Sequence, residues 1–584
     1  MKIYTADFET TTNPDNTFVW AYGISEIGNP SNFIYGTKLS DFILWCYKQK
    51  NTKLYFHNLK FDAEFIIHYL LKNGYEYIKE RKNKKDKSFT CLITSDGLFY
   101  SLEIYFKVGK YHDQKVTIYD SLKILNMSVD KVAKSFNLPI SKLEIDYSKH
   151  NDLPEGSPLS EEEIAYLRND VEIMSRALDI MFNKGFNKMT IGSDALSFYK
   201  KINKKFDYFF PIFDYELDGY LRESYRGGFT YLNPKYKEKE TGRGIVLDVN
   251  SLYPSCMKNE LLPYDTPIFY TGKYEEDKLY PLYIQKISCS FKVKKNKIPT
   301  IQLKNYKFSF LENEYIEDSN GEIYTFTLTS VDLELFLMQY DTPYIKYEFG
   351  YKFKGVRGLF NDYIDYWTEE KIRAKKEGNG GMYTISKLFL NSLYGKFGTS
   401  PNARKKYPYL DNDIVKYGLH DLEQRNPVYV PMASFITSYA RRKTILTSQA
   451  IRDYSLEKYK EDKYVYSDTD SIHCLFDVEE LEKGVFKFLD KDKELNDIID
   501  IDDYRLGAWK IESRYSRGKY IRQKCYIELG YDDKLNVVIA GLPKSLSHKI
   551  NFENFNNELS VGGKLTFKHT KGGIVLVETT FSIK

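Results

Sequence analysis

Two carboxylates lie two positions apart near the start of the chain, in the segment IYTADFETT from Ile3 to Thr11. Successive side chains of a β-strand point to opposite faces, so a strand here would present Asp7 and Glu9 on the same face. Such pairs suit Mg²⁺, because two ions held about 4 Å apart need several carboxylates to offset their charge. Taken alone, the pair is better explained as a solvated strand face.

Two helical segments further along carry more acids. In HNLKFDAEF, a helical pattern that begins after Asn58 contains Asp62. A later helix starts with a capping-box pattern at Ser160 and places Tyr166 one turn before Asp170, on the same face. The tyrosine hydroxyl could then orient an attacking water. Each segment has an ordinary explanation by itself, but their order and residue types together do not.

A second group of acids follows apolar strands. In GIVLDVNSLYPS, an apolar run from Ile245 to Leu247 ends at Asp248, and YVYSDTDSIHCLF places Asp468 and Asp470 in a tight hairpin or an extended strand. A turn rich in Asp is normally only a turn. Because Asp248 follows a strand that should be buried, a two-metal phosphoryl-transfer site is the better interpretation of the set.

A helix between these acids has a polar face. In SKLFLNSLYGKFG, spacings of four and three put Lys387, Asn391 and Tyr394 on one side. The opposite side, which we expect to be buried, carries Leu388, Phe389 and Leu393. Lysine suits a triphosphate and tyrosine suits a nascent base pair. If this segment stood alone, a surface helix would be the preferred interpretation.

Length and composition limit the class of protein. At 584 residues the chain exceeds what one core usually serves, so we expect three or more compact units. The sequence contains 42% apolar and 28% charged residues, and no apolar run is long enough to span a bilayer. The first residues lack the features of a signal peptide, so we expect a cytoplasmic protein without a membrane partner. Six scattered cysteines without a CxxC pair argue against a zinc site and a disulfide framework.

Bulk charge does not identify a nucleic-acid-binding protein. The net charge is only +4, from 85 basic and 81 acidic residues, so a basic groove would have to be balanced by acids elsewhere. The aromatic content is a better indication of nucleic-acid binding: 16% of the residues are aromatic, and 52 of them are tyrosines. Aromatic rings interleaved with lysines suit stacking on bases. Most of these tyrosines nevertheless fit ordinary core and surface positions.

Local patterns indicate how the chain is divided. The charge run Lys79–Lys87 is expected to be the solvated tip of a hairpin, with contact to DNA or a partner as the alternative. Near Gly185 the pattern changes from helix to mixed strands, which predicts a domain end. Tyr363–Lys396 predicts a helical hairpin, Ser400–Pro427 an inserted loop or hairpin, and Gly541–Lys584 a small β unit.

The segments DFET, NLKFD and YLRND, in this order, resemble the 3′-5′ exonuclease of proofreading DNA polymerases. The resemblance implies an RNase H-like fold that gathers Asp7, Glu9, Asp62 and Asp170 around two metal ions. It also implies that Tyr166 and Lys142, in KLEIDY, assist the reaction. Matches to positions that hold a frayed single strand are Thr10, His57, Asn58, Phe61, Phe65, Ser121, Leu122 and Tyr147.

The segments DVNSLYPS, KLFLNSLYGKF and YSDTDS resemble motifs A, B and C of family B DNA polymerases. The resemblance implies that Asp248, Asp470 and Val249 hold metal ions, and that Asp468 is catalytic but less certainly a direct ligand. Matches to nucleotide-binding positions are Val249, Tyr253, Lys375, Lys387, Asn391 and Tyr394. Template and primer contacts are implied by YRGGF, TSYAR and KCY, for Tyr225, Arg226, Gly227, Gly228, Thr437, Arg441, Lys524 and Tyr526.

Over nearly its whole length the chain resembles the protein-primed DNA polymerases of the phage phi-29 type. This implies an α+β multidomain protein, with an RNase H-like exonuclease domain before a right-hand polymerase of palm, fingers and thumb. The expected units are the exonuclease domain at 1–186, palm at 187–259 and 429–540, a terminal-protein insertion at 260–359, fingers at 360–397, a strand-displacement insertion at 398–428 and thumb at 541–584. The sequence departs most from the family at Lys79–Lys87 and Asp477–Asp503.

The implied function is DNA-directed DNA synthesis on a linear phage genome by protein priming, with proofreading and strand displacement. Expected ligands are template and primer DNA, deoxynucleoside triphosphates and two Mg²⁺ per site, with Mn²⁺ as an alternative. The partner would be a terminal protein, the enzyme a monomer or a heterodimer with it, and the compartment the cytoplasm of an infected bacterium. The alternatives are a non-catalytic DNA-binding replication scaffold and a nuclease without polymerase activity.

Overall fold

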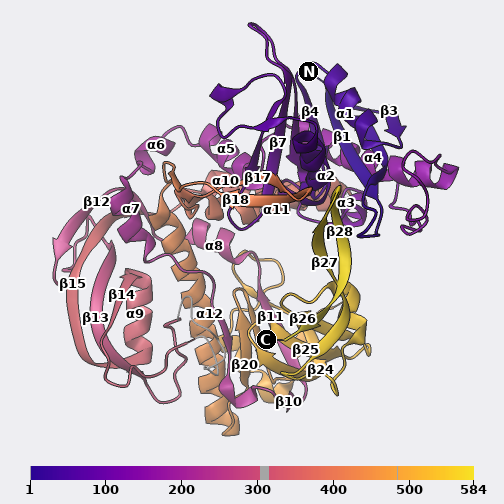
Figure 1. Cartoon of the computed structure of the whole chain (residues 1–584). Coiled ribbons are helices and arrows are strands. Elements are labelled where there is room, and N and C mark those ends of the chain that lie inside the picture. The colour runs from indigo at the N-terminus through magenta and orange to yellow at the C-terminus, as the bar shows by residue number, and fades with distance from the viewer. Residues whose placement is uncertain (1, 303–314, 483, 584) are drawn as a thin grey trace.

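The computed structural model describes residues 2–302, 315–482 and 484–583, and an α/β domain at the N-terminal end lies above a larger body (Figure 1). The fold is the expected α+β multidomain arrangement. Residues 303–314, in the predicted insertion 260–359, lie outside the described residues. All six cysteines are free and buried, as ordinary core thiols would be. Within the described ranges, no helix is both long and apolar enough to cross a membrane.

The N-terminal domain is built on an eight-stranded sheet of order β3-β2-β1-β4-β8-β7-β6-β5. Strand β4 pairs in parallel with β1 and with β8, while β1, β2 and β3 pair antiparallel, as in an RNase H-like sheet. Its strands are β1 (Ile3–Thr10), β2 (Val19–Glu26), β3 (Asn29–Gly36), β4 (Thr52–Phe56), β5 (Glu76–Tyr77), β6 (Ser88–Ile93), β7 (Phe99–Lys107) and β8 (Gln114–Asp120). Its helices are α1 (Leu39–Lys48), α2 (Leu59–Lys72), α3 (Val129–Ser135) and α4 (Glu161–Asn183).

The two faces of this sheet pack against different helices, because successive side chains of β1 point to opposite faces. Tyr4 and Phe8 point into an apolar core shared with α1 and α2. On the other face, the Thr5 hydroxyl donates to the Val171 carbonyl of α4 at 2.7 Å. The expected capping box at Ser160 and Glu163 is present and starts α4. The alternation therefore turns the acids of β1 toward α4.

Two sequence-based expectations about this region are wrong in part. The segment Lys79–Lys87 is exposed as expected, but it is not a hairpin tip, because β5 and β6 pair in parallel and need a crossover between them. Some of its basic side chains form ion pairs within the protein, for example Arg81 with Glu103 at 2.7 Å. After Gly185 the chain continues as helices instead of strands: α5 (Ile191–Ile202), α6 (Phe206–Phe209) and α7 (Tyr215–Arg222). The buried residues Ala195 and Tyr199 follow a helical spacing of four.

The larger body is centred on a second sheet of order β26-β25-β24-β11-β21-β20-β9, with β10 paired to β24. Its strands are β9 (Thr230–Leu232), β10 (Glu240–Thr241), β11 (Gly244–Val249), β20 (Tyr464–Asp468), β21 (Ser471–Cys474), β24 (Trp509–Arg522), β25 (Cys525–Gly530) and β26 (Leu535–Ile539). Helix α8 (Leu252–Asn259) follows β11. Helix α12 (Val430–Tyr459) packs against β20 and β21 of this sheet and against α7 and α8, and it buries most of its side chains.

The predicted helical hairpin is confirmed as α10 (Asn361–Lys376) and α11 (Gly380–Phe397). The chain reverses at Gly378, whose φ of +68° favours glycine. The acidic stretch Asp477–Asp503 forms the short elements β22 (Val478–Glu480), β23 (Phe486–Phe488) and α13 (Leu495–Ile498). Lys458 of α12 pairs with Glu494 at 3.0 Å, so this stretch packs against the end of α12.

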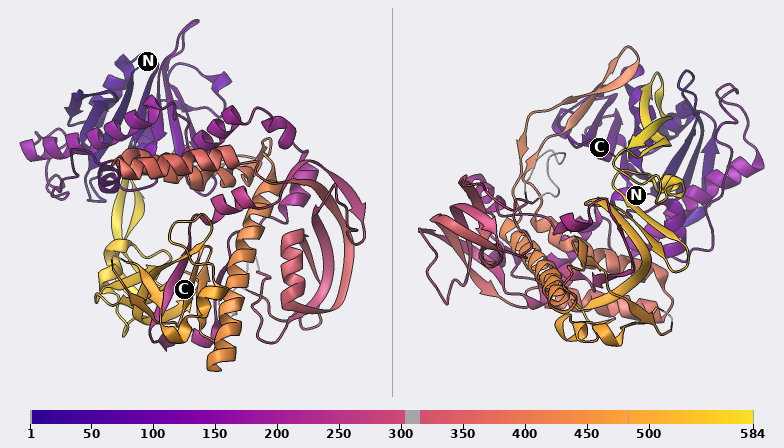
Figure 2. Two further views of the ribbon diagram at one scale, coloured as in Figure 1. Left: turned by 180° about the vertical axis from the view of Figure 1, so that it is seen from behind. Right: turned by 90° about the horizontal axis from the view of Figure 1, so that it is seen from below.

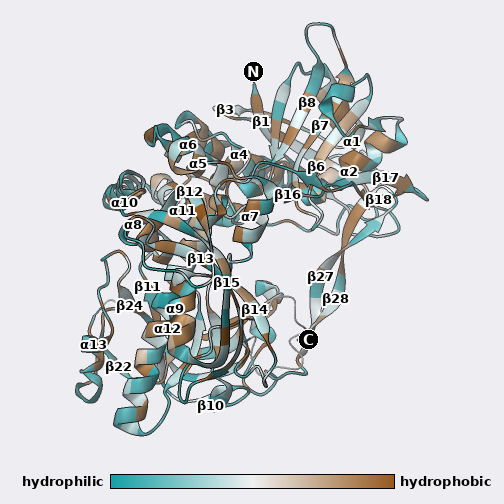
Figure 3. Ribbon diagram, turned by 90° about the vertical axis from the view of Figure 1, so that its left-hand side faces the viewer, coloured by the Kyte–Doolittle hydropathy of each residue, from teal (hydrophilic) through white to brown (hydrophobic). Residues whose placement is uncertain are grey.

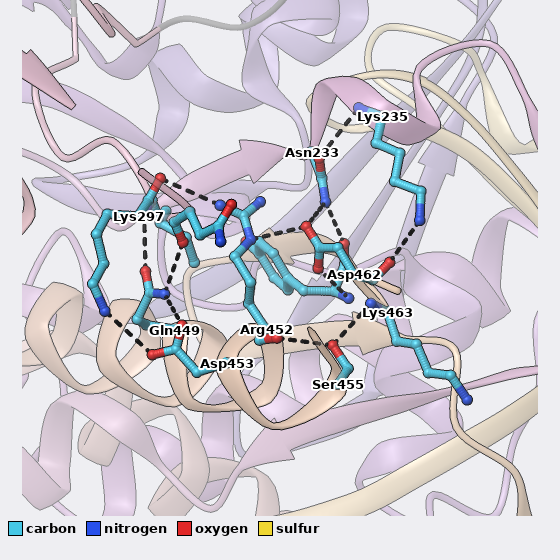
Figure 4. Close-up of polar contacts among 12 residues, drawn as sticks. Asn233, Lys235, Lys297, Gln449, Arg452, Asp453, Ser455, Asp462 and Lys463 are labelled. Atoms are coloured by element: carbon cyan, nitrogen blue, oxygen red, sulfur yellow. Dashed lines mark hydrogen bonds and ion pairs between the residues drawn. The ribbon is translucent and has the colours of Figure 1, made fainter. Parts of the chain in front are cut away.

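A third sheet lies in the region 260–359 and has the order β12-β15-β13-β14. Its elements are β12 (Leu262–Thr271), β13 (Leu282–Val293), β14 (Tyr324–Thr329), α9 (Ser330–Gln339) and β15 (Tyr340–Val356). Figure 4 shows how the end of α12 holds this region: Gln449 accepts the Ile298 N–H at 3.0 Å and donates to the Asn296 carbonyl at 3.0 Å. These contacts tie the third sheet to the palm-like body.

A cleft of about 550 Å³ lies beside the same contacts and away from both groups of acids. Its main charges are paired: Arg452 contacts Asp462 at 2.9 Å and Lys297 contacts Asp453 at 3.2 Å (Figure 4). Asn233 also donates to Asp462 at 2.8 Å. The paired charges indicate a structural junction.

Two β-hairpins reach from the larger body to helix α2 of the N-terminal domain (Figures 1 and 2). The first is the expected hairpin in Ser400–Pro427, and the second is the expected C-terminal β unit. Figure 3 shows their upper ends side by side. Their strands are β16 (Asn402–Ala403), β17 (Lys406–Asp411), β18 (Ile414–Leu419) and β19 (Glu423–Gln424), then β27 (Ser560–Thr570) and β28 (Gly573–Ser582).

Both hairpin tips make polar contacts with the N-terminal domain. Asp413, at the turn between β17 and β18, accepts from His68 at 3.0 Å and from Lys72 at 2.9 Å. The Gly572 N–H, at the other tip, lies 3.2 Å from the same Nε2 atom of His68, which accepts it only in the tautomer that does not donate to Asp413. The Thr570 hydroxyl donates to the Thr17 hydroxyl at 3.0 Å. We call these contacts, from Asp413, Thr570 and Gly572 to Thr17, His68 and Lys72, the tip junction.

Candidate functional sites

Three acids of the N-terminal domain meet between β1 and α4. Asp7 and Glu9 project from β1, as their spacing predicted, and Asp170 faces them from α4. One carboxylate oxygen of each lies within 4.8 Å of the others, close enough for a shared metal ion. Asp62, at the start of α2, is buried and lies close enough to raise the pKa of Glu9. All four predicted acids therefore share one site.

The polar atoms of this site fit a divalent cation. One oxygen of Asp62 and one of Asp170 are buried and accept no hydrogen bond within the part of the chain that the structure describes. A buried oxygen without a partner is costly, and a cation would satisfy both. The predicted ligand set is therefore chemically consistent with Mg²⁺ or Mn²⁺.

Crowding makes these carboxylates hard to ionise. Burial, followed by the charge of Asp170, raises the pKa of Asp7 to about 7, although Lys142 opposes the shift. Burial and the charge of Asp7 raise the pKa of Glu9 and of Asp62 well above the usual range. A divalent ion would reverse this effect by offsetting the charge.

Lys142 and Tyr166 lie where the resemblance implied. Lys142 contacts Asp170 at 2.5 Å and lies 5.2 Å from the ring centre of Tyr166. The Tyr166 hydroxyl hydrogen-bonds the Tyr147 hydroxyl at 2.7 Å, and Tyr147 is 46% exposed. The pair thus connects the buried acids to the surface.

A cavity of about 150 Å³ opens beside Asp7, Lys142 and Asp170 and is also lined by His57. His57 is held at both ring nitrogens, by the Ser121 hydroxyl at 3.0 Å and the Met127 carbonyl at 2.7 Å.

Asp120 supports this region and was missed in the sequence. Its carboxylate accepts the N–H groups of Asn58 and Leu122, both at 3.0 Å. It ends strand β8 next to the predicted residues Ser121 and Leu122, and this position was the available signal.

The other predicted single-strand contacts are less uniform. Phe61 is half-buried and lies 5.6 Å from Phe65, but Phe65 is fully buried. A Cβ added at Gly573 of the C-terminal hairpin would lie 2.4 Å from the Phe65 ring, so the hairpin covers it. Thr10 is buried beside the irregular Glu9–Thr10 pairing of β1. Phe65 is therefore inaccessible to DNA in this conformation.

The second pair of acids meets at the centre of the palm-like sheet. Asp248 is the last residue but one of strand β11, and Asp470 lies in the tight turn that joins β20 to β21. The Val249 N–H donates to the Asp470 carbonyl at 2.8 Å, which joins the two segments. The segment YVYSDTDSIHCLF was expected to be either a tight hairpin or an extended strand, and it forms the hairpin of β20 and β21.

Neighbouring segments fix this turn. Thr469 has a φ of +59°, its N–H donates to the Phe229 carbonyl at 2.7 Å, and its carbonyl accepts from the Thr444 hydroxyl at 2.7 Å. A Cβ at Gly228 would lie 2.6 Å from the Thr469 hydroxyl oxygen. Gly228 is thus required for close packing.

Asp468 has a partner of its own. Both of its oxygens accept from the Lys524 ammonium, at 2.6 and 2.7 Å. This pairing agrees with a role that is less direct than that of Asp470. Tyr526 packs against Tyr466 at 5.2 Å in the same region.

A further carboxylate, Glu512, was missed in the sequence. Burial, Glu512 and Asp470 raise the pKa of Asp248 to about 6, while Lys510 opposes the shift. Burial raises the pKa of Asp470, to which Glu512 also contributes. Lys510 and Glu512 are two positions apart on β24, so the two-residue period of a strand would have placed both side chains on one face in the segment WKIES.

The predicted polar face of α11 is present. Lys387 and Asn391 are exposed, while Phe389 and Leu393 are buried on the other side. Tyr394 is half-buried and stacks on Tyr253 at 4.0 Å.

Lys371, on the neighbouring helix α10, lies close to Lys387 of this face and was not predicted. Burial lowers its pKa, and so do the positive charges of three neighbouring lysines. These are, in order of effect, Lys387, Lys510 and Lys375. Lys371 lies one helical turn before the predicted Lys375, and that spacing would have identified it. We call Lys371, Lys375, Lys387 and Lys510 the lysine cluster.

The predicted contacts in TSYAR are buried. Arg441 is 6% exposed and pairs with Asp332, while it also donates to the carbonyls of Arg226 and Gly227 at 2.8 and 2.7 Å. The Thr437 hydroxyl donates to Ala433 within its own helix. Both groups are already hydrogen-bonded within the protein, and Arg441 supports the neighbouring Tyr225–Gly228 segment. A direct contact of either residue with DNA stays a prediction.

Comparison with known proteins places these sites in context. The sequence profile of type B DNA polymerases, organellar and viral, matches residues 43–156 and 154–475. The DNA polymerases of Bacillus phages Nf and phi29 are 41% and 40% identical to the chain, over all of it and 100% and 99% of their own lengths. The structure of phi29 DNA polymerase complexed with primer-template DNA and incoming nucleotide substrates matches at 40% identity with a TM-score of 0.90, and all of both chains is covered.

We expect Asp7→Asn to stabilise the metal-free protein at pH 8 by on the order of 2 kcal/mol, with no gain at pH 4. The pKa of Asp7 is about 7 in the folded protein and about 4 in an unfolded chain. The protonated Asp7 therefore does not destabilise the fold below about pH 4, and the free energy of unfolding falls as the pH rises through 7. Asparagine cannot ionise and avoids this loss. Thermal unfolding in a chelator would measure it.

The exposed acid Asp15, changed to Asn, is the matched control. Added Mg²⁺ should stabilise the parent at pH 8 more than it stabilises Asp7→Asn. Equal stability of parent and variant at both pH values would contradict the assigned crowding.

Proposed function

Because this chain belongs to the organellar and viral type B DNA polymerases, and within them to the phi29 type, we propose that it replicates a linear phage genome from a protein primer and proofreads its product. It is a DNA polymerase, a nucleotidyltransferase. The observation that supports two separate activities, synthesis and proofreading, is that the two acidic sites have different surroundings. One lies beside the lysine cluster, and the other beside Tyr147 and a single lysine.

For synthesis, Asp248, Asp470 and the Val249 carbonyl would hold two Mg²⁺, which would activate the priming hydroxyl and offset charge on the departing pyrophosphate. Lys387 and Lys371 bind the triphosphate, because ammonium groups that converge from α10 and α11 attract phosphate oxygens. The stacked rings of Tyr253 and Tyr394 form one wall for the new base pair. Lys524 keeps Asp468 in place beside Asp470.

For proofreading, Asp7, Glu9, Asp62 and Asp170 would hold two metal ions, which would activate water and stabilise the leaving 3′ oxygen. The Tyr166 hydroxyl, fixed by Tyr147, orients the attacking water. Lys142 holds Asp170 and lowers the repulsion among the acids. Phe61 and the exposed ring of Tyr147 offer stacking surfaces for a frayed strand.

The two insertions extend the activity. We assign the third sheet, in 260–359, to engagement of a terminal protein whose side-chain hydroxyl supplies the first primer. We assign the hairpin in 398–428, together with the C-terminal hairpin, to processivity and strand displacement, because the tip junction closes a ring through α2. A polymerase that encloses its template can extend the primer over long distances without a separate clamp protein.

The ligands in this proposal are template and primer DNA and deoxynucleoside triphosphates. The phi29 enzyme has been seen with primer-template DNA and incoming nucleotides, and the chains align over their full length. The enzyme acts as a monomer or with the terminal protein as a heterodimer. The relatives are phage proteins, and we place its work in the cytoplasm of the infected bacterium.

Asp248→Ala should reduce primer extension by at least 10³-fold while degradation of a single strand continues, since only one metal site is lost. Asp7→Ala should show the opposite pattern. The assay uses a labelled primed template with Mg²⁺, with nucleotides and then without them. Persistent extension by Asp248→Ala would show that the synthesis site was assigned wrongly.

The same assay tests the alternatives. A protein without either activity would support the replication scaffold. Shortening without extension would support a nuclease only.

Gly572→Ala should shorten the products made in one binding event several-fold. Gly572 has a φ of +99°, and an added Cβ would lie 2.3 Å from the Thr17 carbonyl oxygen, so the tip junction would be forced apart. Extension in the presence of a heparin trap measures processivity. Incorporation of the first nucleotide should be unchanged because the tip junction includes no residue of the site around Asp248 and Asp470.

Gly321→Ala is the matched control, since Gly321 has a φ of +81° but no atom within 4 Å of an added Cβ. It shares the backbone strain without the clash. If Gly572→Ala made products of normal length, the hairpins would not act as a closed ring.

Protein priming predicts that a deoxynucleotide becomes covalently attached to a partner protein. Purified enzyme, the terminal protein of the same phage, template ends and one labelled nucleotide should give a labelled protein band that resists denaturation. Asp248→Ala should abolish the band. Extension of DNA primers without any such band would restrict the function to ordinary primed synthesis.

A further inference from the structure

Lys510 lies directly opposite a proposed metal ligand. The antiparallel pairing of β11 with β24 aligns Asp248 with Lys510. The Lys510 ammonium lies 3.4 Å from the Asp248 carboxylate, and the two side chains are 34% and 22% exposed. Cross-strand neighbours share a face of the sheet, so this contact follows from the fold.

This position conflicts with metal binding at Asp248. An ammonium and a divalent ion would compete for the same carboxylate, and two cations a few ångströms apart repel each other. Lysine has a flexible four-carbon stem and can move its charge without any change in the strand. The ammonium must therefore have a second position once an ion is bound.

The lysine cluster indicates where that position lies. Lys371 and Lys387 come from the two helices above the sheet, and Lys510 is near enough for its charge to act on Lys371. Like charges converge on one space at a cost unless an anion enters it. The incoming triphosphate brings several negative charges to this space.

We propose that Lys510 is a nucleotide-positioning residue that exchanges partners: it neutralises Asp248 in the metal-free enzyme and binds the terminal phosphates of the incoming nucleotide once a metal ion takes Asp248. The inference rests on the proposed role of Asp248 as a metal ligand. It makes Lys510 the only member of the lysine cluster that the palm-like sheet contributes, among the described residues, while the other three lie on α10 and α11.

Exchange of partners predicts two opposite changes in Lys510→Met, which keeps the stem and removes the charge. Nucleotide binding should weaken about tenfold because a charged contact to phosphate is lost. Metal binding at Asp248 should tighten several-fold because a competing cation is gone. A lysine that only stabilised the fold would weaken both together.

The two affinities can be measured without catalysis. Nucleotide affinity is measured from ternary complexes on a dideoxy-terminated primer-template in Ca²⁺. Metal affinity is measured from free Mn²⁺ in an Asp62→Ala background, with and without Asp248→Ala, so that the difference isolates the synthesis site. Lys510→Arg should retain most nucleotide affinity. Lys519→Met, on the same strand, is the control.

Opposite shifts in Lys510→Met would support the proposal. Unchanged nucleotide affinity, or a parallel loss of both affinities, would overturn it. If Asp248→Ala leaves Mn²⁺ binding unchanged, the metal assignment in the proposed function fails instead, and this result is distinguishable because it does not involve Lys510.

Discussion

Repulsion among carboxylates is the constraint on which both sites depend. Asp7, Glu9 and Asp170 lie within 4.8 Å of one another, and no local segment would hold them so close in water. Each comes from an element fixed by its own core or hydrogen bonds, so the repulsion is opposed by the whole domain. The sites are therefore ready for a cation before it binds, and they are less stable without one.

Residues without direct chemistry supply this support. Gly228 permits Thr469 to hold the turn of Asp470, and Asp120 fixes the start of α2 through the Asn58 N–H. Arg441 and Asp332 do the same for the segment that ends at Gly228. In the last two cases a backbone group next to a functional residue is fixed by a side chain far away in sequence.

Much of the N-terminal site was predictable because its information is local. Alternation along β1 placed Asp7 with Glu9, and helical spacing placed Tyr166 with Asp170. Glu512 and Lys510 could not be assigned to the synthesis site in this way, because the pairing of β24 with β11 depends on sheet order. The burial of Phe65 and Arg441 is likewise set by distant segments, the C-terminal hairpin and α9. The misassigned helices after Gly185 reflect short apolar runs that fit either period.

Helix α2 has 14 residues, so it is about 21 Å long. Asp62 lies in its first turn, and His68 and Lys72 of the tip junction lie in its second half. A continuous hydrogen-bonded helix moves as a stiff rod. Under the proposed function, a displacement of the hairpin tips would also shift Asp62. A substitution that opens the ring around DNA would then impair proofreading as well as processivity.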